Sequence, residues 1–142
     1  MKIWIANKHL TGLTELLAAM SLKPGPSRAR TKLLDLVRQA AKRFSDDEYE
    51  LVTQYACLNE NGKPRIDAQG TFTLACPEKA QEFFSARQSL FDSLAEVSGP
   101  TYQNHLQEVK SLIETYDGEL AGQQADAFCA LSEQAISKGE TA

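Results

Sequence analysis

One apolar stripe through residues 27–57 constrains the fold of this chain more than any other feature. With a step of about 100° per residue, six apolar residues fall within about 60° of one another on a helical wheel: Leu33, Val37, Ala40, Phe44, Leu51 and Tyr55. The motif SDDE at 45–48 matches a capping box and also fits a break followed by a restart. Because the stripe keeps its phase across this motif, we predict one long helix over 27–57.

Shorter elements precede this helix. The alternating pattern KIWIAN predicts a strand within residues 1–7, and leucines at helical spacing predict a helix up to about Met20. Pro24 and Pro26 are expected to end that helix, because proline cannot continue the hydrogen-bond ladder. Ser27 is then expected to cap the long helix.

Shorter strands and helices are expected after the long helix. The pattern predicts a hairpin over 59–75, a helical region over 77–137 that includes a short strand at LAEV, and a frayed tail at 138–142. The chain is therefore expected to form a single domain over 1–142. Its class is α+β and predominantly helical, a helical bundle with a small antiparallel sheet or β-hairpin.

The predicted hairpin is longer than a simple connection requires. Asn61-Gly62 and Gln69-Gly70 are both turn signals, and Lys63 and Arg65 lie between them. A minimal link needs only about 2–5 residues. We therefore expect this segment to protrude and to take part in binding.

The composition is that of an ordinary globular chain, with 142 residues, 42% hydrophobic content and a net charge of −4. No apolar run approaches the roughly 18 residues of a membrane span, and MKIWIANKHL lacks an apolar stretch of signal-peptide length. Three cysteines without CxxC spacing lead us to expect reduced thiols in the cytoplasm. Cys57 and Cys129 are expected to fill apolar helix positions, and Cys76 to be exposed.

No catalytic or metal-binding signature stands out. His9 and His105 lack the spacing of a zinc site and are expected at the surface. Neither a glycine-rich phosphate loop nor a Gly-x-Ser-x-Gly motif occurs. The acidic run Asp46-Asp47-Glu48 points in three directions on a helix, which favours a cap or a solvated corner over a cation site. We expect a protein that is not an enzyme and has no catalytic residue, metal ligand or cofactor.

The segment Lys23–Phe44 carries seven Lys and Arg residues against one acid. Most of these bases lie opposite the apolar stripe, as on the polar face of any amphipathic helix. Arg30 differs because it lies in line with Val37 on the apolar side. There it must snorkel, bind an anion at the helix N-terminus, or pair with a carboxylate. We expect an ion pair with at least half burial. The candidate binding residues are Arg28, Arg30, Lys32, Lys63 and Arg65.

Three blocks of sequence follow one another along the chain: the opening strand with KPGPSRARTKLLDLV, then YACLNENGKPRIDAQGTFTL, then LIETYDGELAGQQADAFCALSEQAI. In this order they resemble a family of small phage and prophage proteins, domain of unknown function 1617. The sequence departs from the family at Ala121, where Ser is frequent, and at Phe128-Cys129, where Tyr-Asp is common. The resemblance implies a one-domain protein that acts inside the infected cell. It implies no activity, cofactor or functional residue.

These features lead us to expect a phage or prophage accessory protein that binds a host or phage protein in the cytoplasm of an infected or lysogenic bacterial cell. Inhibition of a host or defence factor is one form of this function. The alternative is a module that binds a small anionic ligand or a nucleic acid through the basic segment 28–43. No membrane contact is expected. A homo-oligomer is a further expectation, since the first helix is apolar over a wide arc: Leu10, Leu13, Leu16, Leu17, Met20 and Leu22.

Overall fold

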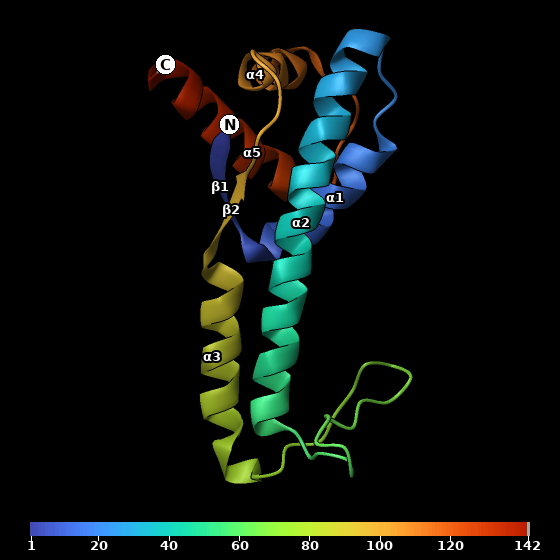
Figure 1. Cartoon of the computed structure of the whole chain (residues 1–142), viewed down its shortest axis with the longest axis vertical. Helices are drawn as coiled ribbons and strands as arrows, with labels where there is room; N and C mark the ends of the chain where they lie inside the picture. The colour runs from blue at the N-terminus through green and yellow to red at the C-terminus, as the bar shows by residue number, and fades with distance from the viewer. Residues whose placement is uncertain (142) are drawn as a thin grey trace.

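Helix α2 (Pro24–Tyr55) runs the length of the molecule (Figure 1). The computed structural model describes the backbone of residues 1–141 and the side chains of residues 1–136. The first part of α2 belongs to a wide head, and its last part continues beyond the head as one side of a narrow arm (Figure 1). We call residues 45–92 the arm and the other described residues the head. The long helix predicted from the apolar stripe is confirmed as one uninterrupted element.

Helix α2 begins three residues earlier than expected. Lys23 is its N-cap, Pro24 lies in its first turn, and the Ser27 N–H donates to the Lys23 carbonyl at 2.9 Å. Proline is tolerated in a first turn because the N–H groups there have no acceptor within the helix. The prolines do separate two helices, but they also start the second one, so the prediction of Ser27 as its cap is wrong.

The head contains a two-stranded antiparallel sheet. Strand β1 (Lys2–Ala6) pairs with β2 (Leu94–Ser98), and Ile3 lies opposite Val97. The helical elements of the head besides α2 are η1 (Asn7–His9), α1 (Leu10–Ala19), α4 (His105–Thr115) and α5 (Gly122–Thr141). The predominantly helical α+β class is confirmed. The frayed tail expected over 138–142 falls outside the residues whose side chains are described.

Helix α1 is covered on several sides by its own chain. It packs against α2 and α5. At Gly12 a Cβ atom would lie 2.7 Å from the Gln123 carbonyl oxygen, so only glycine permits this approach of α1 to the start of α5. The buried residues of the apolar arc are Leu10, Leu13, Leu16, Leu17 and Met20. The arc therefore gives no reason of its own for a second copy of the chain.

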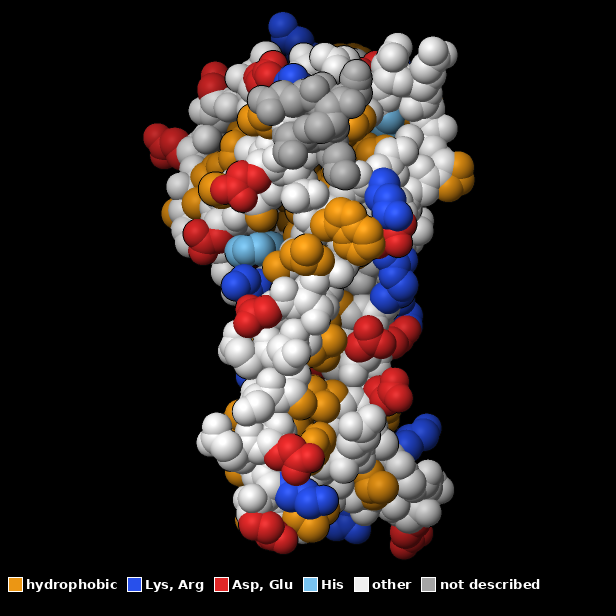
Figure 2. Space-filling view, turned by 90° about the vertical axis from the view of Figure 1, so that its left-hand side faces the viewer, with side chains coloured by type: hydrophobic (Ala, Val, Ile, Leu, Met, Phe, Trp, Pro, Cys, Tyr) orange, Lys and Arg blue, Asp and Glu red, His pale blue; other side chains and the backbone are white. Residues whose placement is uncertain are grey.

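The arm has much less core than the head. It consists of the end of α2, a loop, η2 (Pro77–Lys79) and α3 (Ala80–Asp92), which returns alongside α2 (Figure 1). The buried residues between positions 45 and 92 are Ala56, Pro64 and Phe83. Leu51 and Tyr55, which belong to the apolar stripe, are half-buried. Apolar side chains are exposed along the arm in Figure 2.

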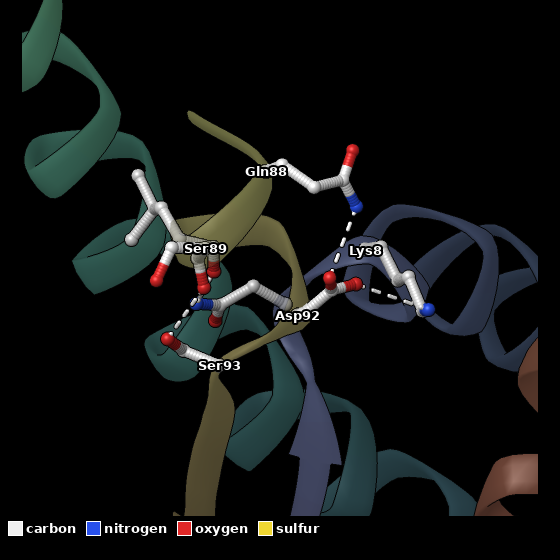
Figure 3. A network of polar contacts seen from close by, with 7 residues as sticks. Lys8, Gln88, Ser89, Asp92 and Ser93 are labelled. Atoms are coloured by element: carbon white, nitrogen blue, oxygen red, sulfur yellow. Dashed lines mark hydrogen bonds and ion pairs between the residues drawn. The ribbon is translucent and has the colours of Figure 1, made fainter. Parts of the chain in front are cut away.

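Polar contacts fix α3 to the head where the arm begins (Figure 3). Lys8 Nζ lies 3.2 Å from one carboxylate oxygen of Asp92, and the Gln88 amide donates to the other at 3.0 Å. These two donors lower the pKa of Asp92, with Gln88 contributing more. The Ser93 hydroxyl donates to the Ser89 carbonyl at 2.8 Å and closes the last turn of α3. The base of the arm is thereby tied to η1.

Candidate functional site

A groove of about 570 Å³ lies in the arm, between α2, α3 and the loop that joins α2 to η2. Both helices and the loop contribute to its walls. The lining residues are Ser45, Glu48, Tyr49, Leu51, Val52, Ile66, Gly70, Thr71, Phe72, Leu74, Phe83, Phe84 and Arg87. A cleft of this size with mostly apolar walls is of the kind that binds ligands or side chains of a partner.

Three large apolar side chains of this groove face solvent. Tyr49 is 48% exposed, Ile66 is 43% exposed and Phe84 is 56% exposed. Leu58 at the start of the loop is also 43% exposed. Large apolar side chains gathered in one place on a surface mark interaction sites, whereas scattered ones carry no such meaning.

Phe83 forms the floor of the groove and joins its three walls. Its ring meets that of Tyr55 from α2 at 5.5 Å, that of Phe72 from the loop at 5.4 Å, and that of Phe84 at 5.6 Å between centroids. The first two pairs are edge-to-face, the arrangement that the charge distribution of aromatic rings favours. Tyr55 is held further by a hydrogen bond from its hydroxyl to Glu82 at 3.1 Å. Burial and this bond raise the Tyr55 pKa.

The loop wall contains two successive turns of one design. The Asn59 side chain accepts from the N–H groups of residues 61 and 63, and Gly62 follows at φ 76°. Eight residues later, Asp67 accepts from those of 69 and 71, and Gly70 follows at φ 80°. Short side chains that accept from the backbone two residues ahead stabilise such turns, and glycine permits the positive φ. Both predicted turn signals are confirmed, although isolated bridges take the place of one continuous hairpin.

The two helical walls of the groove carry side chains of opposite charge. Glu48 lies on α2 and Arg87 on α3, and neither takes part in a salt bridge among the described side chains. The Arg87 guanidinium lies 4.4 Å from the centre of the Phe91 ring. Asp46 is paired with Lys42 at 2.6 Å. Glu48 thus offers a carboxylate that a bound partner can meet.

The binding residues predicted from sequence do not come together in one site. Arg28, Arg30 and Lys32 lie near the start of α2, whereas Lys63 and Arg65 lie in the loop that follows its other end. At about 1.5 Å per residue, 27 helical residues separate these ends by about 40 Å. None of the five lines the groove.

Arg28 is occupied by contacts within the head. Its guanidinium lies 3.1 Å from Glu108 and stacks 4.0 Å from the centre of the Tyr102 ring. The Tyr102 hydroxyl also donates to Glu108, and these two partners lower the Glu108 pKa, Tyr102 most. Arg28 thus links α2 to α4 through one nitrogen of its guanidinium, and its side chain is 59% exposed.

Arg30 is more than half buried, as expected, but its partner is not a carboxylate. Its Nη1 donates to the carbonyls of Leu17 and Met20 at 2.9 and 2.7 Å. These carbonyls belong to the end of α1, where no N–H within the helix is left to bond them. None of the salt bridges among the described side chains involves Arg30. The predicted ion pair is wrong, because backbone carbonyl oxygens accept the hydrogen bonds of the buried guanidinium in place of a carboxylate.

Comparison with known families gives one match, which covers nearly the whole chain. The model of a protein family of unknown function, DUF1617, matches residues 1–137. The chain belongs to this family. No curated protein and no solved structure matches it.

One histidine of this DUF1617 member is buried, contrary to expectation. His105 is 1% exposed, and its Nε2 lies 3.0 Å from the Ala29 carbonyl of α2. Its Nδ1 is buried without a hydrogen-bond partner among the described groups. Burial lowers the His105 pKa, because the charged imidazolium loses its hydration. His105 therefore belongs to the packing between α4 and α2.

The cysteines of this family member also differ from expectation in two of three cases. Cys57 is half-buried in the loop and Cys129 is exposed, so neither fills the core. Cys76 is exposed, as predicted. Within the part of the chain that the structure describes, no three His, Cys, Asp or Glu side chains gather as a metal site would require. No described helix has the length and apolarity to cross a membrane.

Sequence reasoning missed Tyr49, Phe84 and Arg87 as site residues of this DUF1617 protein. A usable signal was present in Phe83-Phe84, because neighbouring residues on a helix point about 100° apart. When one of two adjacent rings on a helix is buried against a neighbouring element, the other ring therefore points away from that element. Tyr49 gives a similar signal, since it lies outside the stripe of α2.

Proposed function

We propose that this protein acts by binding another protein through the groove of its arm. The observation that carries the proposal is the exposure of Tyr49, Ile66 and Phe84 around one apolar groove. Aromatic and large apolar side chains dominate the energy of protein interfaces, and such residues are normally covered in the working state. The head supports this role as a rigid base, because it contains nearly all of the core.

We further propose that the protein is not an enzyme and that its partner is a host or phage protein. The titratable side chains in the groove are Glu48, Tyr49 and Arg87, and no His or Cys lines it. This supports binding over catalysis. The phage and prophage resemblance supports a partner in the cytoplasm of an infected or lysogenic bacterial cell, including a host or defence factor that binding inhibits.

The alternative of an anionic ligand or nucleic acid at residues 28–43 has less support. Arg28 contacts Glu108, Lys42 contacts Asp46, and Arg30 and Arg43 donate to backbone carbonyls. Specific nucleic-acid binding usually relies on several Lys or Arg side chains that lie on one face and have no partner within the protein. Four of the six basic side chains in this segment thus have partners within the chain, and Lys32 and Arg38 have none among the described side chains.

The experiment compares capture by three forms of the tagged protein in lysates of infected or lysogenic cells. Phe84→Ser alters the groove, and Leu94→Ser is its matched control, since Leu94 is 62% exposed on β2 outside the groove. A partner retained by the wild type and the control but lost with Phe84→Ser supports the proposal. Equal capture by all three forms, at equal melting temperatures, contradicts it.

A further inference from the structure

Two of the three walls of the groove are antiparallel helices, α2 and α3, and the loop forms the third. Ser45, Glu48, Tyr49 and Val52 line it from α2 at spacings of three, four and seven residues, which is one helix face over two turns, and Leu51 lies beside this face. Phe84 and Arg87 line it from α3 at a spacing of three. Two antiparallel helices with one exposed apolar face between them can be covered by a third helix.

An added β-strand fits this site less well than a helix. Strand addition needs free N–H and C=O groups at an edge. In the turn nearest the groove, the N–H groups of Asp67, Gly70 and Thr71 already donate within the loop. The other walls are helices, whose backbone groups bond internally. Contact must therefore be made by side chains, as when an amphipathic helix places its apolar face in a groove.

The charge of the arm selects among such helices. Residues 45–92 contain nine acids and four bases, a net charge of −5. In the groove itself Glu48 on α2 and Arg87 on α3 both lack a salt-bridge partner among the described side chains, so the carboxylate lies on the α2 wall and the guanidinium on the α3 wall. Asp46 and Asp92 are paired with lysines of the head, which leaves seven acids against four bases in the arm. A second arm would bring a surface of the same sign against the first, which disfavours a second copy as the occupant. A basic helix meets the same surface with complementary charge.

We propose that the groove binds an amphipathic helix of a partner protein, with an apolar stripe against Tyr49 and Phe84 and lysine or arginine on the edge that faces Glu48. This inference rests on the proposed protein-binding function and adds the kind of partner. The apolar stripe supplies most of the affinity, and the basic edge supplies orientation and the rate of association.

The test uses three synthetic peptides of about 18 residues, five helical turns. The first has a leucine stripe and a lysine-rich polar face, the second has glutamate in place of lysine, and the third has the composition of the first in an order that abolishes the stripe. Binding to the full chain is measured by fluorescence anisotropy. The lysine peptide should bind at least about tenfold more tightly than either of the others.

Variants locate the contact. Phe84→Ser should weaken the lysine peptide at least about tenfold, and Leu94→Ser should leave it unchanged. Glu48→Lys should weaken it by about two- to fivefold, the range for one exposed charge pair. Equal binding of the scrambled or the glutamate peptide, or binding unaffected by Phe84→Ser, overturns the inference. So does a dimer in sedimentation experiments that Phe84→Ser dissociates, since the occupant is then a second copy.

The two proposals can fail separately. If the groove variant loses a cellular partner but the lysine peptide does not bind, the helix is wrong and protein binding through the groove stands. If neither a cellular partner nor a peptide depends on Phe84, both are wrong. A captured partner that the lysine peptide displaces supports both.

Discussion

Arg30 Nη1 lies 2.7 Å from the carbonyl oxygen of Met20, so a charged side chain of α2 closes the end of α1. Hydrogen bonds to charged groups contribute about 1.5–3 kcal/mol each in favourable settings. Arg30→Ala should therefore lower the free energy of unfolding by about 1.5–3 kcal/mol. Lys32→Ala, two residues away and exposed, is the control and should change it by less than about 0.5 kcal/mol. Equal effects in urea unfolding would show that the contact contributes little.

The buried His105 predicts a loss of stability on mild acidification. Because burial lowers its pKa in the folded state, the unfolded chain takes up the proton first as the pH falls below about 6.5. The contribution of His105 is thus fully present above that pH and is lost as the pH falls toward the lower, folded pKa. His105→Gln should flatten the dependence of the melting temperature between about pH 7.5 and 5.5, and His9→Gln should not.

Substitutions of the adjacent residues Phe83 and Phe84 should have different effects, the first on stability and the second on binding. Phe83 is 5% exposed and joins three walls, so Phe83→Ala should destabilise the protein by about 3–5 kcal/mol, as for buried phenylalanines elsewhere. Phe84→Ala should cost about 0.5 kcal/mol or less, since its ring is mostly in solvent. Chemical denaturation of both variants measures this difference. A large loss with Phe84→Ala would mean that the ring serves the fold rather than a partner.

Replacing either loop glycine, Gly62 or Gly70, by alanine should destabilise its turn by a similar amount. At Gly62 and Gly70 an added Cβ meets nothing within 4 Å, so alanine suffers only from the positive φ. Each substitution should cost about 1–2 kcal/mol, locally in the loop. Gly25→Ala in α2 also meets nothing within 4 Å and needs no positive φ, so it is the control. Faster hydrogen exchange in 56–75 for the loop variants, but not for the control, would show this effect.

Sequence periodicity predicted the fold well where one face of an element is covered. The stripe from Leu33 to Tyr55 identified α2 although its second half has little core above it, because the pattern reports where a helix faces and not how deeply it is buried. The same limit explains the wrong expectations for His105 and Cys129. Their exposure depends on how α4 is turned against α2 and how α5 is turned against α1 and α4, which the spacing within one helix does not contain.

The candidate site was harder to predict because its parts are distant in sequence. Charge drew attention to Arg28 and Arg30, but the structure uses both within the head. The groove arises only when α3 returns beside α2 and Phe72 folds onto Phe83. Such a juxtaposition depends on long-range packing. The loop was the exception, since Asn59 and Asp67 and the glycines after them define its turns locally.

Because α2 is one uninterrupted helix, the number of residues between the head and the arm determines the direction in which the groove faces. Each residue inserted between Ala40 and Ser45 would turn the arm by about 100° about the helix axis and move it outward by about 1.5 Å. A single insertion would also pull the Phe44 ring out of register with Phe91, which it now meets at 5.6 Å. Only insertions close to whole turns, matched in α3, would keep the groove facing the same way. Seven residues, close to two turns, would extend the arm by about 10.5 Å and rotate the groove by only about 20°.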